Sequence, residues 1–157
     1  MIMDSTAEFC DATSVAAAAS VALVGNVMDL GADGRDIGNS GPLFLVITCS
    51  TDIITGGAAG TISFQLASDA QAAIAVDGTA SEHIITRAFI TDDATPNELD
   101  SGQLIVAQAL PMAGLDAYER YLGILVTIAT TTVTAGAINA FLTPDVAAWR
   151  AVADGVN

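Results

Sequence analysis

Apolar and polar positions alternate most clearly over residues 121–128. Neighbouring residues of a β-strand point to opposite faces, so such alternation describes a strand with two different sides. One face is apolar throughout and the other is mixed: Leu122, Ile124, Val126 and Ile128 against Tyr121, Gly123, Leu125 and Thr127. The pattern predicts a strand that is buried on one side and half-covered on the other, as in a β-sandwich or jelly roll.

A second segment, residues 61–67, alternates in the same way, with Ile62, Phe64 and Leu66 predicted to face inward. The loops between strands are marked by dense Gly, Asp, Asn and Pro. No stretch of convincing length has helical periodicity, which disfavours alternating strands and helices. The sequence therefore predicts an all-β, single-domain sandwich of about eight short antiparallel strands. Further strands are expected over residues 21–30, 43–50, 83–90, 103–110 and 135–142.

Both ends of the chain are predicted to form short arms on a domain that spans residues 1–157. Residues 1–13 are polar with one aromatic side chain, Phe9, and form an N-terminal arm or a short strand. Residues 144–157 permit a short helix or an extended arm, with Trp149 anchoring the arm on a neighbouring subunit. Phe9, Trp149 and the adjacent Arg150 are therefore candidate interface residues.

The composition indicates that the chain binds other subunits. Hydrophobic residues, many of them Ala and Val, make up 52% of the chain and charged residues only 14%. This excludes a disordered protein and indicates an oligomer or a shell-bound protein that covers apolar surface with other subunits. There are 18 acidic and 4 basic residues, and the formal net charge is −14. Binding to nucleic acid or to anionic membranes is therefore disfavoured. A solvated or salt-adapted surface and a partner with a basic docking surface both fit the acidity.

The residues that could perform chemistry are few. Without lysine the chain has no P-loop lysine and no Schiff-base lysine. His83 is the only histidine, and Ser40 lies in GNSGP, which fails the GxSxG pattern at Pro42. The loop aspartates Asp29, Asp33 and Asp36 do not follow the EF-hand pattern and are interpreted as turn residues. We therefore expect no catalytic residues, no cofactor and no metal site.

Two further features concern the compartment. Cys10 and Cys49 lack CxxC or metal-ligand spacing and are interpreted as small buried apolar residues, which suits a reducing compartment. Val15–Gly25 is apolar, but acidic rather than basic residues precede it and it is too short to span a bilayer. We expect neither a secretory signal nor a membrane span there.

Arg120 is the most informative charged residue. It falls on the same face as Leu122 and Ile124, whereas the adjacent Glu119 points the opposite way. Its guanidinium must therefore find a carboxylate elsewhere. Two alternatives fit: an ion pair at the rim of the sandwich, or a salt bridge between subunits. Arg35 and Asp36 of the glycine-rich loop form a second candidate contact.

Four segments in this order and spacing resemble the small jelly-roll cement (decoration) proteins that tailed bacteriophages carry on their capsids. They are MDLGADGRDIGNSGPLFLVI, FQLASDAQAAI, ERYLGILVTI and the DxxxW-like tail, at residues 28–47, 64–74, 119–128 and 145–155. The missing lysines and the acidic, Ala-rich composition depart from that family. Glu119, Arg120 and Tyr121, which open the third segment, join the candidate interface residues together with the preceding Tyr118.

The resemblance implies a jelly roll made in the host cytoplasm that assembles as a homotrimer on the outside of a virion capsid. It would bind the major capsid protein of the same phage and stabilise contacts between its subunits, without enzyme activity. The alternative is a jelly-roll carbohydrate-binding or host-attachment module. That alternative would need aromatic residues in the loops, for which the chain offers Tyr118, Tyr121 and Trp149.

Overall fold

The protein is almost entirely β-structure. A computed structural model describes residues 5–31, 37, 41–92, 98–111 and 117–146. Within these ranges a single 3-10 turn, Ser5–Ala7, precedes the strands, and no helix is long and apolar enough to cross a membrane. The strands are β1 (Glu8–Ser14), β2 (Ser20–Asp29), β3 (Phe44–Ile54), β4 (Thr61–Asp69), β5 (Ser81–Ile85), β6 (Phe89–Ile90), β7 (Leu104–Ala109), β8 (Tyr121–Ala129) and β9 (Ala135–Thr143).

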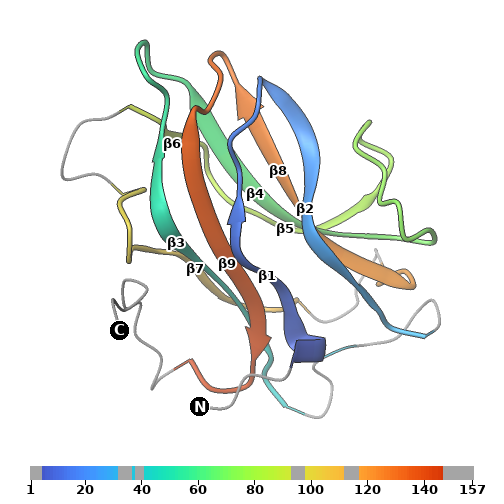
Figure 1. The fold of residues 1–157 in the computed structure, drawn as a ribbon. Helices are drawn as coiled ribbons and strands as arrows, with labels where there is room; N and C mark the ends of the chain where they lie inside the picture. The colour runs from blue at the N-terminus through green and yellow to red at the C-terminus, as the bar shows by residue number, and fades with distance from the viewer. Residues whose placement is uncertain (1–4, 32–36, 38–40, 93–97, 112–116, 147–157) are drawn as a thin grey trace.

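The strands form two antiparallel sheets that pack face to face (Figure 1). One sheet has the order β1-β9-β3-β7, and the other has the order β2-β8-β4-β5, with β6 also paired to β4. Since β5 and β6 share one edge position, the nine strands fill eight positions. Successive strands alternate between the two sheets except for β4, β5 and β6, which follow one another in the same sheet; this is the strand order of a jelly roll. The predicted all-β jelly-roll sandwich is confirmed.

The core lies between the sheets and follows the alternation in the sequence. The inward faces of β4 and β8 carry large apolar side chains in one cluster, and each is at most 5% exposed: Ile62, Phe64, Leu66, Leu122, Ile124, Val126 and Ile128. Burying side chains of this size contributes roughly 1.5–3 kcal/mol each. Both strands therefore have the inward faces that the sequence predicted.

A second, smaller apolar cluster lies outside the core, on the outer face of the β2-β8-β4-β5 sheet. Ile74, from the connection between β4 and β5, packs there with Ala67 and Leu125. Asp69 stabilises this connection, because its carboxylate accepts hydrogen bonds from the backbone N–H groups of Gln71 at 3.0 Å and Ala75 at 2.9 Å. The half-covered second face predicted for β8 is therefore covered by the protein's own loop.

The predicted strand over residues 83–90 is wrong in one respect, because it is two strands. Thr86 interrupts it: its hydroxyl accepts the Phe64 N–H and its own N–H donates to the Phe64 carbonyl, both at 2.9 Å. A side chain thus replaces one ladder bond, and β6 begins only at Phe89. Side-chain hydroxyls of Ser and Thr commonly compete with backbone pairing in this way.

The N-terminal segment is also more ordered than an arm. Residues 8–14 form β1, which pairs with β9 at the edge of its sheet, so the short-strand alternative holds there. Phe9 is fully buried in the core. The C-terminal arm predicted over residues 144–157 lies outside the described residues from position 147 onward.

Candidate functional site at the open edge of the sandwich

On the side of the sandwich away from β1 and β2, the edge strands of the two sheets border a groove. There β7 pairs only with β3, while β5 and β6 pair only with β4, so the strands that border this side belong to different sheets. A groove of about 710 Å³ runs between them. We call this region the open edge. Its lining comprises Ile85, Thr86, Arg87, Phe89, Glu98, Gln103 and residues 104–108 of β7.

The open edge concentrates exposed apolar side chains. Ile85 is 55% exposed and Leu104 is 48% exposed, one on each wall of the groove. Ile90 of β6 is 59% exposed and follows buried Phe89, but it does not line the groove. Large apolar residues that gather on a surface and are bordered by polar groups are typical of an interaction site.

Strand β7 is an edge strand with little protection against further pairing. Its sequence, LIVAQA, contains no charged residue and no proline. The pairing of β7 with β3 shifts register at Ile105, so one bulge is present, and bulges are one of the means by which proteins blunt an edge. From Val106 to Ala109, however, the pairing with β3 is regular and three of the four residues are exposed.

The only charges in the described lining of the groove neutralise each other. Arg87 forms an ion pair with Glu98, and its guanidinium carbon lies 4.2 Å above the centre of the Phe89 ring. The lining therefore carries no net charge, although the whole chain has a formal charge of −14. The rest of the groove offers the uncharged side chains of Gln103 and Gln108.

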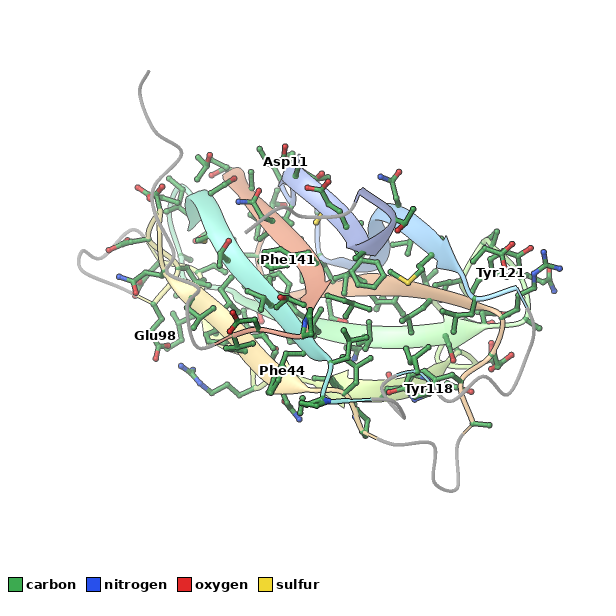
Figure 2. The ribbon with its side chains drawn as sticks, turned by 90° about the horizontal axis from the view of Figure 1, so that it is seen from below. Asp11, Phe44, Glu98, Tyr118, Tyr121 and Phe141 are labelled. Atoms are coloured by element: carbon green, nitrogen blue, oxygen red, sulfur yellow. The ribbon has the colours of Figure 1, made fainter. Side chains whose placement is uncertain are left out.

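Arg120, the basic residue singled out from the sequence, lies in a different place. It binds Asp29 of its own chain in a two-pronged contact, with Nε to Oδ1 and Nη2 to Oδ2 both at 2.9 Å. Its guanidinium also lies 5.0 Å from the centre of the Tyr121 ring. Figure 2 shows Tyr121 on the opposite side of the molecule from Glu98. The structure therefore contains the rim ion pair, and the intersubunit salt bridge stays a prediction.

The contact with Arg120 explains the acidity of Asp29. Hydrogen bonding from Arg120, followed by the backbone N–H of Gly31, lowers the pKa of this carboxyl from its usual 3.8 to about 2. The Asp29 carboxylate accepts the Gly31 N–H at 2.8 Å and closes a turn there, which agrees with its interpretation as a turn residue rather than a calcium ligand. Within the described residues no group of three potential metal ligands occurs.

Tyr118 and Glu119 form part of an internal polar cluster. Tyr118 is fully buried, stacks on His83 with ring centres 4.0 Å apart, and donates its hydroxyl to the Pro111 carbonyl at 2.8 Å. Glu119 accepts the Ser81 hydroxyl at 2.7 Å. The prediction that Tyr118 and Phe9 contact another subunit does not fit their burial, because neither exposes any side-chain surface.

The same cluster contains a serine–histidine contact that the sequence did not indicate. The Ser68 hydroxyl lies 2.7 Å from Nε2 of His83 and also accepts the Glu119 N–H at 3.0 Å. Ser68 is fully buried, so its hydroxyl is not open to a substrate. The contact joins β4, β5 and the segment before β8, so His83, in the middle of β5, has a structural role there.

Several candidates lie outside the described part of the chain: Ser40, Asp33, Arg35, Asp36, Trp149 and Arg150. The cysteines do lie within it, and both are buried and free. Burial raises the pKa of Cys10 to about 11 and that of Cys49 to about 12. Both thiols are therefore protonated at neutral pH, which agrees with their interpretation as small buried apolar residues.

The open edge was missed by the sequence reasoning. A signal was present: LIVAQA is an uncharged strand within a strongly acidic chain. Its position at the border of a sheet depends on which strands pair, and that information is not contained in the strand itself.

Comparison with known proteins gives a family. The Bbp16 family model matches residues 9–142, most of the chain and nearly the whole sandwich. The chain belongs to the Bbp16 family, which is associated with phages. No curated protein matches the chain.

Proposed function

We propose that this member of the Bbp16 family is a capsid cement protein of a phage. As a homotrimer on the outer surface of the virion it would bind the major capsid protein and stabilise contacts between its subunits. The role is structural and requires no catalysis.

The jelly-roll sandwich, with an open edge that exposes apolar side chains and has no net charge in its described lining, carries this proposal. A cement protein needs a rigid body and surfaces that hold other subunits. The described residues provide the first through two antiparallel sheets around an apolar core, and the second through Ile85 and Leu104 at the open edge. The phage association of the family adds independent support for a place in the virion.

The acidic surface supports a shell partner that presents basic groups. Opposite charges on two docking surfaces guide their encounter and favour the correct orientation. The carbohydrate-binding alternative lacks comparable support, because Tyr118, one of its three aromatic residues, is fully buried and Arg120 lies over the ring of Tyr121.

Quantitative mass spectrometry of purified particles tests the proposal. We expect this protein in a copy number comparable with that of the major capsid protein. Particles made without it should break at lower temperature and under milder osmotic shock, and adding purified protein back should restore their resistance. A few copies per particle, or equal resistance without the protein, would refute the cement role.

A further inference from the structure

We infer that the open edge binds a second copy of this chain, so that β7 of one subunit meets the β5/β6 wall of the next. The inference deepens the proposed function, because it assigns the homo-oligomer to one surface. It leaves the acidic remainder of the protein for the capsid.

Charge favours a second copy as the occupant. Two chains that each carry a formal charge of −14 repel each other wherever their acidic surfaces meet. In the described lining of the groove this repulsion is small, since Arg87 and Glu98 neutralise each other and the other lining residues are uncharged. A basic partner would instead gain most by binding the acidic surface. The neutral open edge therefore suits a like-charged copy.

Backbone pairing gives the copy a means of attachment. Among the described strands, β7 has a neighbour on one side only, and the other side of an edge strand presents N–H and C=O groups that a further strand can pair with. No charged side chain or proline on β7 opposes such an approach. On the facing wall, Ile85 exposes 55% of its surface and can cover Leu104 of a neighbour.

The two walls differ, and that difference allows a closed ring. A cyclic assembly with more than two subunits needs two complementary surfaces on each copy, one for each neighbour. The β7 wall and the β5/β6 wall come from different sheets and present different side chains. Each copy thus offers both halves of a head-to-tail contact.

Substitution of an exposed residue on each wall tests the inference. Leu104→Glu and Ile85→Glu place a charge in the proposed interface at positions that are about half exposed, so the fold should tolerate them. Val76→Glu is the matched control: Val76 is 45% exposed, lies on the connection between β4 and β5, and does not line the groove. All three variants add the same negative charge.

Sedimentation equilibrium of the full-length protein should show an oligomer for the wild type and for Val76→Glu. For Leu104→Glu and Ile85→Glu we expect the dissociation constant of the oligomer to rise at least about tenfold, because a charge within a desolvated contact weakens that contact strongly. Raising the salt from about 0.05 to about 0.5 M should strengthen the wild-type oligomer by screening the repulsion between acidic copies. Circular dichroism checks that each variant is folded.

A wild type that stays monomeric at high concentration would overturn the inference, as would a folded Leu104→Glu variant that associates as well as Val76→Glu. Such a result is separate from failure of the cement role. In that case Leu104→Glu and Ile85→Glu would associate normally, while the wild-type protein would still be found in particles at a high copy number. If the protein is absent from particles but the variants still dissociate as expected, the cement role fails and the copy-to-copy surface stands.

Discussion

Gly25 of β2 is where the structure is least tolerant of a larger side chain. It has a φ of +75°, a conformation that residues with a Cβ adopt at a cost. A Cβ added to Gly25 would collide with the Phe9 carbonyl and lie 2.6 Å from the Cβ of Cys10, both on β1. The register between β2 and β8 shifts at this point, between Val24 and Met28. Gly25 therefore permits the close approach of two edge strands from different sheets.

The effect of Gly25→Ala can be separated into two contributions. The positive φ costs roughly 1–2 kcal/mol for a residue other than glycine. Collision with the backbone of β1 adds about 1–3 kcal/mol, because a backbone carbonyl cannot rotate away as a side chain can. We therefore expect a loss of about 2–5 kcal/mol in the free energy of unfolding, a large part of the roughly 5–15 kcal/mol of an ordinary domain.

Two other glycines provide controls, one for the conformational cost alone and one for a position with neither contribution. Gly78 has a φ of +89°, but a Cβ added there would have no atom within 4 Å, so Gly78→Ala should show the conformational cost alone. Gly57 has neither the unusual φ nor a near neighbour, so Gly57→Ala should change stability by less than about 0.5 kcal/mol. Urea unfolding followed by fluorescence or circular dichroism gives the three values.

The ranking of the three variants is the result that matters. Gly25→Ala should unfold at the lowest urea concentration, followed by Gly78→Ala and then Gly57→Ala. If Gly25→Ala and Gly78→Ala are equally stable, the contact between β1 and β2 does not constrain position 25, and the argument for close packing there is wrong.

Three further outcomes follow from the described contacts. The low pKa of Asp29 stabilises the fold above its usual value of 3.8, and this contribution is lost as the pH falls through about 2; Arg120→Ala should raise that pKa, seen by NMR titration, and no change would contradict the ion pair. Cys10 and Cys49 should resist alkylation until urea unfolds the protein, since both thiols are buried and have raised pKa values; rapid labelling of the native protein would count against this. Tyr118→Phe should lower the free energy of unfolding by about 0.5–1.5 kcal/mol, because the hydrogen bond to the Pro111 carbonyl is lost while the stacked ring remains; an unchanged urea midpoint would show that the bond contributes nothing.

The inward-facing residues were predicted most accurately in strands that bury one face. Alternation identified the inward residues of β4 and β8, because burial on one side leaves a period of two in the chain. It failed at Thr86, where a side-chain hydroxyl takes over a ladder bond. A threonine within an apolar run looks like an ordinary strand residue, since its competing hydrogen bond depends on the neighbouring strand.

The candidate site was less predictable because its elements are distant in sequence. Arg120 was expected to need a carboxylate, but Asp29 lies 91 positions away and was found only through the pairing of β2 with β8. Phe9 was interpreted as a terminal anchor because it is an isolated aromatic residue near the chain start. The pairing of β1 with β9 instead places it in the core.

The two sides of the sandwich show why one of them is the better docking surface. On one side, β1 and β2 approach so closely at Gly25 that even a methyl group does not fit. Farther along the same two strands lies a groove of about 670 Å³, but its lining includes the acidic Glu8 and Asp29. On the other side, β7 and the β5/β6 wall leave a groove of about 710 Å³, and the break at Thr86 shortens the strands that border it. A jelly roll can close both sides with its own side chains. Here the apolar residues that would close the second side, Ile85 and Leu104, remain about half exposed, as expected if another subunit completes the contact.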